Sequence, residues 1–294
     1  MSNRAKGILC IVASAFGFAL MAMFVRLCDD FGGAVSSFQK SFFRNVIALV
    51  IAVAVFLGER RVGREGEQPR AIVPRSGRAW TTLLLRAVFG TVGIFANFYA
   101  LSHIPIAEGQ TLNKTAPFFT VAFSWLFLGE RASLRQALTL ALAFGGVLLI
   151  AKPGFAGAAA FPLAMGILGG ACAGAAYTCV RKLGLMKVDG ALIVLFFSVF
   201  SCLASVPFML VRFDPMTILQ VLALLGAGAG AAIGQFGITA AYRYAAPRQI
   251  AVYDYLNILF TAVFGFVLFG QVPDAWSLAG FAIIVLAAVR MRTR

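Results

Sequence analysis

Apolar residues along this chain gather into long continuous blocks, which short polar links separate. Within a block they neither alternate with polar residues nor keep to one face of a helix. A helix that crosses a bilayer needs roughly 20 apolar residues, whereas a barrel strand would alternate over about 10. The pattern predicts an all-α membrane protein with ten transmembrane helices, near residues 7–28, 34–58, 80–101, 105–128, 134–151, 162–182, 190–211, 216–241, 248–269 and 275–289.

The overall composition agrees with this class. Of the 294 residues, 61% are hydrophobic and only 12% are charged, whereas soluble domains are roughly half apolar and about a quarter charged. The lipid bilayer is therefore the expected surroundings of most of the chain. Helices suit these surroundings because they satisfy their own backbone hydrogen bonds.

The distribution of basic residues predicts the orientation. If the first residues lie in the cytoplasm, 18 of the 25 Lys and Arg residues fall on the inner side and three on the outer side. This asymmetry follows the positive-inside rule and predicts that both termini are cytoplasmic. The formal charge of +14 is spread over several loops, so nucleic acid is not expected as a partner.

The second half of the chain repeats the first after a shift of 141 residues. "APFFTVAFSWLFLGER" (116–131) then lies over "NILFTAVFGFVLFGQV" (257–272). The ten spans divide into halves of five, an odd number, so the second half enters the membrane from the opposite side. We therefore predict two inverted five-helix repeats, 1–153 and 154–294. Inverted repeats build secondary transporters whose site lies near the midplane at the repeat interface.

Three stretches resemble a known family. They are "FFRNVIALVIA" (42–52), "APFFTVAFSWLFLGERASLRQALTLALAFGGVLLIAKPG" (116–154) and "YDYLNILFTAVFGFVLFGQVPDAWSLAGFAII" (253–284). With them the chain resembles the ten-span EamA-type branch of the drug/metabolite transporter superfamily over nearly its whole length. The resemblance implies that each predicted repeat is EamA-like and that the function is transport. It implies no particular substrate, because the branch carries amino acids, metabolites, nucleoside-like compounds and drugs.

Ionisable residues within the predicted spans are the first candidates for a site. They are Lys40, Arg44, Arg86, Glu108, Lys114 and Asp254. A charge at mid-bilayer costs at least ~2.5 kcal/mol, so each should face protein or water. The four cations outnumber the two acids, which favours a substrate with a carboxylate or another anionic group.

Helical spacing arranges polar residues of two spans into stripes. Asp254, Asn257 and Thr261 recur at intervals of three and four residues on the ninth span, which places them on one face. Asn113 and Thr120 form a matching stripe on the fourth span, where Asn113 lies over Asp254 after the 141-residue shift. We expect the two stripes to meet where a substrate binds.

These patterns assign roles to individual residues. The predicted substrate-binding residues are Arg86, Asn97, Asn113, Lys114, Tyr177, Gln235, Asp254, Tyr255 and Asn257. Glu108 or Asp254 is expected to carry a coupling proton, since an acid in a cavity is the usual relay group. Arg44, Lys40 and Pro117 receive structural roles, with Arg44 as a counter-ion of Glu108 and Pro117 as a helix kink. Arg44 could instead bind an anionic group, and the polar residues could merely join helices by hydrogen bonds.

The predicted function is secondary active transport of a small polar organic metabolite by alternating access, in a bacterial inner (cytoplasmic) membrane. An amino acid, an amino-acid derivative or an S-adenosylmethionine-like solute fits the expected charges. A broad-specificity multidrug or metabolite exporter is the alternative. A polytopic membrane enzyme would need a cluster of acids or nucleophiles that the sequence does not offer, so no catalytic residue, metal or cofactor is expected. Either a monomer or a homodimer is compatible with the sequence.

Overall fold

The computed structural model describes residues 2–33, 35–61, 74, 76–104, 106–152, 160–211 and 213–292. Within these ranges every element is helical. Their bounds are α1 (Asn3–Asp30), α2 (Ser37–Arg61), α3 (Gly77–His103), α4 (Ile106–Asn113), α5 (Ala116–Leu128), α6 (Leu134–Ala151), α7 (Ala160–Leu185), α8 (Gly190–Val211), α9 (Ile218–Tyr244), α10 (Pro247–Ile250), the 3₁₀ helix η1 (Ala251–Tyr255), α11 (Leu256–Phe269) and α12 (Ala275–Arg292).

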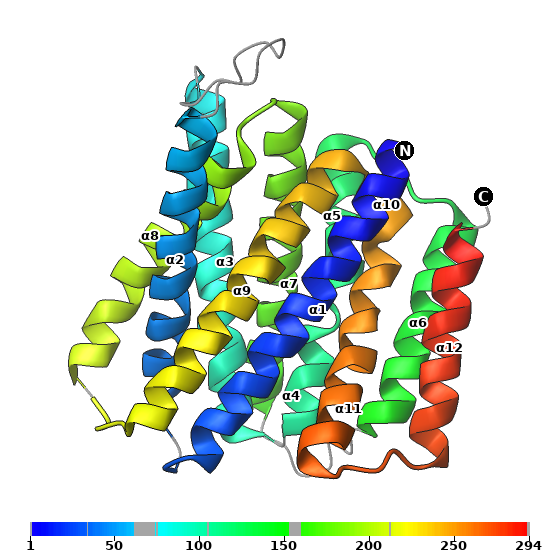
Figure 1. Ribbon diagram of the computed structural model, residues 1–294. Helices are drawn as coiled ribbons and strands as arrows, with labels where there is room; N and C mark the ends of the chain where they lie inside the picture. The colour runs from blue at the N-terminus through cyan, green and yellow to red at the C-terminus, as the bar shows by residue number, and fades with distance from the viewer. Residues whose placement is uncertain are drawn as a thin grey trace.

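The helices run between the two ends of one bundle (Figure 1). At one end α1, α3 and α6 begin and α12 ends, and we call it the upper end, as it is drawn in Figure 1. At the other, the lower end, α1 and α6 end and α12 begins. These two ends are the reference for the positions given below.

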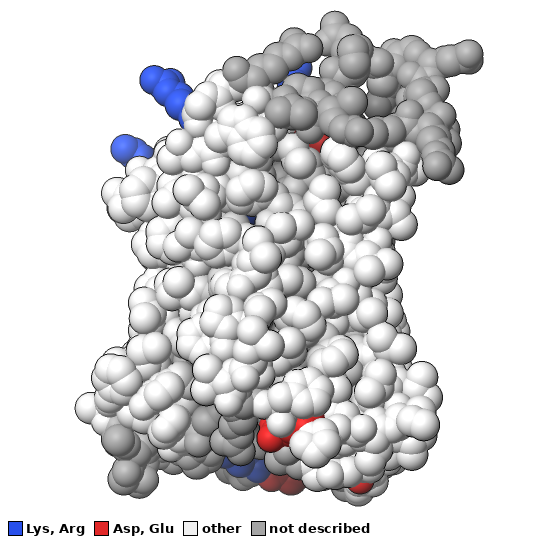
Figure 2. Space-filling view, turned by 90° about the vertical axis from the view of Figure 1, so that its left-hand side faces the viewer, with Lys and Arg blue, Asp and Glu red and all other residues white. Residues whose placement is uncertain are grey.

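A band almost without charged groups lies between the two ends on the face shown in Figure 2. Large apolar side chains are exposed on the bundle, among them Leu126 (71%), Phe127 (68%) and Val267 (68%). Exposed apolar surface of this extent is unfavourable in water, whereas lipid tails accommodate it.

Eight helical segments of the described residues are long and apolar enough to cross a membrane. The remaining apolar helices are α12, whose apolar part Ala275–Met291 is shorter, and the pair α4 and α5. The structure thus agrees with an all-α membrane protein, while the number of ten spans stays a prediction.

The fourth and the ninth predicted spans are both interrupted. Lys114 and Thr115 form a turn between α4 and α5, and η1 stands between α10 and α11. Pro117 occupies the second position of α5, where a missing N–H leaves no intrahelical bond unmade. Thr115, two residues before Pro117, keeps α-helical φ and ψ angles (−75° and −14°), so the chain stays in a helical conformation at this point. The helix kink at Pro117 stays a prediction.

Helix bounds coincide after the 141-residue shift from α3 onward. The shift carries 77–103 (α3) onto 218–244 (α9) and 134–151 (α6) onto 275–292 (α12). The ends of α5 and α11 also coincide, at Gly129 and Gly270, whose φ angles are 69° and 62°. Glycine adopts this left-handed conformation without steric cost.

Backbones approach closely where long helices cross. α1 packs along α9, α3 along α7, α2 against α8 and α6 against α12. A Cβ atom on Gly17 would lie 2.6 Å from the backbone nitrogen of Gly234, so α1 and α9 can meet this closely only without side chains. Small residues are the usual means of close packing between helices in membranes.

Two adjacent glycines of α6 provide a matched test of this packing. An added Cβ would lie 2.7 Å from the Gly280 carbonyl oxygen at Gly146, but would meet nothing within 4 Å at Gly145. We expect Gly146→Ala to destabilise the protein by about 1–3 kcal/mol through overpacking. Gly145→Ala should be neutral or stabilise the helix by up to about 1 kcal/mol. Thermal unfolding of the two purified variants measures the difference, and equal melting temperatures would contradict the close contact between α6 and α12.

Candidate functional site

The two interrupted spans touch each other in the middle of the bundle. The Lys114 ammonium donates a hydrogen bond to Asn257 Oδ1 (2.8 Å), and Asn257 Nδ2 donates to the carbonyl of Ala15 (3.0 Å). The Tyr255 hydroxyl donates to the Lys114 carbonyl (3.2 Å). That carbonyl is available because Phe118 N–H bonds to Thr115 instead of continuing the helix. The structure therefore brings together three of the predicted binding residues, Lys114, Tyr255 and Asn257.

Asp254 lies on η1 beside this group and is half-buried. Its carboxylate is close enough to interact electrostatically with Lys114, Tyr177 and Tyr242. Asn113 is the last residue of α4, directly before the break, and is also half-buried. The predicted pair of Asn113 and Asp254 thus lies at the two breaks.

Arg86 on α3 is buried with neutral partners. Its side chain is 2% exposed, donates to Gln235 Oε1 on α9 (2.9 Å) and lies over the ring of Phe197 on α8 (4.0 Å to the ring centre). Removing an ion from water costs several kcal/mol, of the order of ~5, unless an opposite charge offsets it. The bond to Gln235 and the cation–π contact offset only a part of this cost.

Arg44 on α2 is the second buried guanidinium. It is 9% exposed and donates to the Met21 sulfur (3.4 Å) and to Asn45 Oδ1 (3.3 Å). Asn45 in turn donates to the Ser201 hydroxyl on α8 (2.8 Å). The side chain of Glu108, its predicted counter-ion, lies outside the described residues.

Tyr177 on α7 connects these groups. It lies near Arg44, Arg86 and Asp254, and its ring lies 5.5 Å from that of Tyr242 on α9. The polar centre of the bundle therefore contains side chains from both halves of the chain. We use the name central cluster for Arg44, Arg86, Lys114, Tyr177, Gln235, Tyr242, Asp254, Tyr255 and Asn257.

Three further residues of the sequence analysis lie elsewhere. Lys40 forms an ion pair with Asp29 (2.6 Å) near the lower end. Asn97 on α3 is half-buried and packs against Gly169 of α7. Thr261 was expected on the polar stripe, but its side chain is exposed and its hydroxyl donates to the Asn257 carbonyl of its own helix (2.8 Å). Because this bond satisfies the hydroxyl, Thr261 has no need to face the centre.

Sequence reasoning missed several residues of the centre. Asn45 carries a signal, since it is a polar residue next to Arg44 within a span, and Ser201 is its partner. Phe197 and Tyr242 carry none, because an aromatic residue in an apolar span is ordinarily a packing residue.

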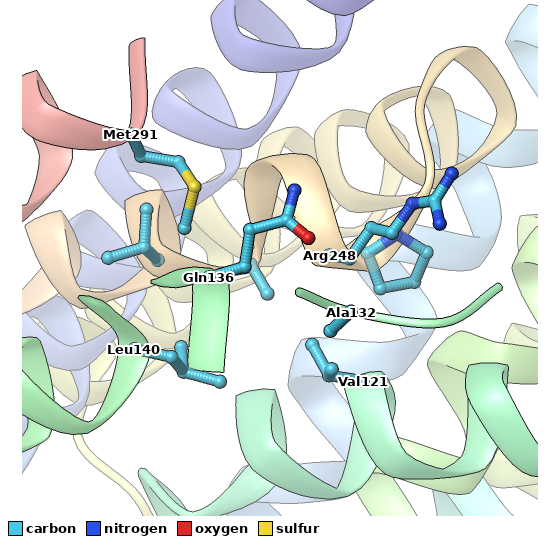
Figure 3. A pocket seen from close by; sticks show the side chains of 9 residues that line it. Val121, Ala132, Gln136, Leu140, Arg248 and Met291 are labelled. Carbon is cyan, nitrogen blue, oxygen red and sulfur yellow. The ribbon is translucent and has the colours of Figure 1, made fainter. Parts of the chain in front are cut away.

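Two cavities lie side by side at the upper end. One of about 10 Å³ is lined by residues of α5, α6, α10, η1 and α12, including Gln136, Arg248 and Met291 (Figure 3). The other, of about 290 Å³, lies beside it and shares Gln136 and Met291. Neither lining includes a member of the central cluster. The open space of these two cavities therefore lies nearer the surface than the central cluster does.

An ion pair between Lys152 and Asp274 joins α6 to α12 at the lower end. The bond from Lys152, followed by that from Ser277, lowers the pKa of the Asp274 carboxyl to about 2. A lowered pKa adds stability that is complete above the usual value of about 4 and is lost between about 4 and 2. We therefore expect Asp274→Asn to change uptake by the same factor at pH 5 and at pH 8. A factor that differs between the two pH values would contradict this assignment, and thermal unfolding checks that the exposed pair adds little to stability.

Comparison with known proteins agrees with this picture. The model of the EamA-like transporter family matches residues 5–152. The pseudopaline exporter CntI of Pseudomonas aeruginosa (strain UCBPP-PA14) is 29% identical over 287 residues, 97% of this chain and 95% of the exporter. Human solute carrier family 35 member G1 is 26% identical over 298 residues, 96% of this chain and 78% of the carrier.

Two further matches are another transporter and a solved structure. The riboflavin transporter of Brucella anthropi is 26% identical over 214 residues, 70% of this chain and 74% of the transporter. A crystal structure with 19% sequence identity superposes with a TM-score of 0.75, covering 96% of this chain and 99% of the other, and so shares the fold. The family match spans half of the chain and confirms the resemblance to EamA-type transporters. The chain therefore belongs to the EamA-like transporter family and is a multi-pass membrane protein.

Proposed function

We propose that the protein is a secondary active transporter of a small polar organic solute with an anionic group, and that it works by alternating access. The single observation that carries the proposal is the contact of Lys114 with Asn257, which joins the breaks of two spans in the middle of the bundle. Broken helices at mid-membrane are typical of transporter sites, because unwound backbone and charged side chains can contact a solute there.

The helix bounds support two inverted repeats as the basis of alternating access. The 141-residue shift superposes the bounds of α3 on α9 and of α6 on α12, and it carries the turn at 114–115 onto 255–256, where η1 meets α11. We propose halves that end and begin at 153 and 154, a boundary that lies outside the described residues. In such a pair, exchange of the conformations of the two halves exchanges the side to which the site opens.

The charges of the central cluster support an anionic or zwitterionic solute. The cluster contains three cations, Arg44, Arg86 and Lys114, and one described carboxylate, that of Asp254 beside Lys114. The two arginines bond to neutral partners. An amino acid or an amino-acid derivative would place its carboxylate near the cations and its ammonium near Asp254. An S-adenosylmethionine-like solute could also stack its base on Tyr177 and Tyr242, whose rings lie side by side.

Asp254 is the proposed proton carrier, because it is a half-buried acid beside Lys114. Glu108 is the second candidate by its sequence position. We further propose an inner-membrane location with the upper end in the cytoplasm, in keeping with the bacterial origin of the pseudopaline exporter. A monomer or a homodimer fits the proposal equally.

A broad-specificity exporter is the second candidate function. It is favoured by the different solutes in the names of the relatives, pseudopaline and riboflavin. A membrane enzyme receives less support, since the relatives are named as transporters.

Uptake by the purified protein in proteoliposomes tests the proposal. A panel of zwitterionic, anionic, neutral and cationic metabolites is offered with and without a pH gradient. We expect saturable uptake of a few related anionic or zwitterionic solutes. Carriage of chemically unrelated drugs at similar rates would favour the broad exporter, and no carrier-dependent flux of any solute would contradict transport.

A further inference from the structure

The larger cavity at the upper end is strongly basic. It has a volume of about 290 Å³ and lies between the first turns of α1, α6 and α10 and the last turn of α12. Among its described lining residues the charged ones are Arg4, Arg135 and Arg290, and none of these described residues is Asp or Glu. Arg4 also donates to the carbonyl of Met291. Guanidinium groups present planar sets of donors that bind carboxylate or phosphate in a bidentate manner.

Further donors surround the same cavity. Ser133, Gln136, Thr139 and Gln249 contribute hydroxyl and amide groups to its lining. Helix α6 begins here with a capping box, in which Ser133 N–H donates to Gln136 Oε1 (2.9 Å) and Gln136 N–H to the Ser133 hydroxyl (3.3 Å). The positive end of the α6 dipole thus adds to the charge of the three arginines.

A smaller pocket lies between this cavity and η1. The small pocket of about 10 Å³ in Figure 3 shares Gln136 and Met291 with it and reaches Ala251 and Val252 of η1. Asp254 follows Val252 by two residues on the same short helix. A space of about 10 Å³ admits at most about one water molecule, so the side chains of the small pocket close the path at this point.

The lower end of the same helix pair is arranged differently. The 141-residue shift places Ser133 over Asp274, and both residues precede the first turn of their helices. Asp274 forms an exposed ion pair with Lys152, which caps the end of α6. At the upper end the corresponding residue is the uncharged Ser133, and arginines of both helices line the cavity. The helix pair α6 and α12 therefore has an exposed ion pair between its helices at one end and a cavity lined by three arginines at the other.

We propose that this cavity is the first binding position of the transported solute on the upper side, and that Arg4, Arg135 and Arg290 hold its carboxylate or phosphate group there. The inference rests on the proposed function. The solute would then move past Gln136 and Met291 toward η1 when the small pocket widens. The arginines would serve to select anions before the solute reaches the central cluster.

Binding is tested without transport, in nanodiscs of phosphatidylcholine alone. Thermal unfolding is followed at rising potassium phosphate or citrate, with potassium chloride of equal ionic strength as reference. Wild-type protein should be stabilised in a saturable manner. In Arg135→Gln and Arg290→Gln the half-saturating concentration should rise about tenfold, because each variant loses a charge-assisted contact.

Arg78→Gln is the matched control. Arg78 lies in the first turn of α3, is exposed at the same end, and is absent from the lining of both cavities. This variant should bind both anions as the wild type does. If Arg78→Gln weakened anion binding as much as Arg135→Gln, the binding would depend on general surface charge, and the proposal would be overturned. Stabilisation only in nanodiscs that contain phosphatidylglycerol would identify a lipid headgroup as the occupant and overturn it as well.

Uptake from the upper side provides the second measurement, with a solute that the wild type carries. In proteoliposomes of uniform orientation, Arg135→Gln should raise KM about tenfold and leave the maximal rate nearly unchanged, because the central cluster is intact. An unchanged KM would contradict the proposed role of the cavity, but it would not contradict the proposed transport function. Absence of uptake in the wild type would contradict the proposed function, while saturable phosphate binding would still be measured separately.

Discussion

Lys114→Met is expected to abolish saturable uptake while the protein still folds. Methionine has nearly the length of lysine, but it cannot donate to Asn257 Oδ1 or attract an anionic group. Loss of one partner of a buried hydrogen-bonded charge costs about 2–5 kcal/mol in binding, which corresponds to at least about a 30-fold loss of affinity. Proteoliposome uptake measures the loss, and size-exclusion chromatography verifies the fold.

Two variants serve as controls for Lys114→Met. Lys114→Arg keeps the charge and should retain part of the activity. Thr261→Val alters a polar residue of α11 whose side chain is exposed, and it should transport like the wild type. If Lys114→Met took up solute at the wild-type rate, the contact between Lys114 and Asn257 would not be part of the binding site. The proposed role of the two interrupted spans would then be contradicted.

Glu130→Gln is expected to lower the stability of the upper end strongly. Glu130 follows α5 and pairs with Arg181 of α7 (2.7 Å), and their side chains are only 14% and 13% exposed. Arg181 also donates to the carbonyls of Tyr242 (3.3 Å) and Arg243 (3.4 Å) near the end of α9. Removal of one partner from a buried pair leaves an uncompensated charge, so we expect a loss of roughly 3 kcal/mol in thermal or denaturant unfolding.

An exposed ion pair and a double substitution provide the comparison. Arg26 and Asp30 pair at the lower end with side chains 56% and 45% exposed, so Asp30→Asn should have little effect on unfolding. Replacement of both partners, Glu130→Met with Arg181→Leu, should recover much of the loss, because no lone charge remains. Equal melting temperatures for Glu130→Gln and Asp30→Asn would show that the buried pair does not hold the upper end.

The sequence predicts the positions of the spans well, because lipid requires apolar residues along a whole helix. Residues 134–151 and 190–211 were predicted as spans, and α6 and α8 have these bounds. The break before Pro117 is harder to predict, since proline is compatible with the first turn of a new helix as well as with a kink. The 3₁₀ segment η1 cannot be predicted from the pattern of apolar residues.

The candidate site could be predicted in part. Asn257 and Lys114 are polar residues deep in apolar spans, and the cost of burying them indicates that they need partners. Their direct contact depends on how α5 and α11 approach each other, which hydropathy does not determine. The basic cavity depends on the ends of α1, α6, α10 and α12, which are far apart in the chain. No local pattern brings Arg4, Arg135 and Arg290 to one place.

The bonds between the two interrupted spans have a consequence for the permeability barrier. Lys114 holds Asn257 through its ammonium group, and Tyr255 holds the Lys114 carbonyl. Neither break can therefore straighten or unwind without disturbing the other. Both bonds must break before a path can open between the two spans. We therefore expect the protein without bound solute to conduct no passive ion current between transport cycles.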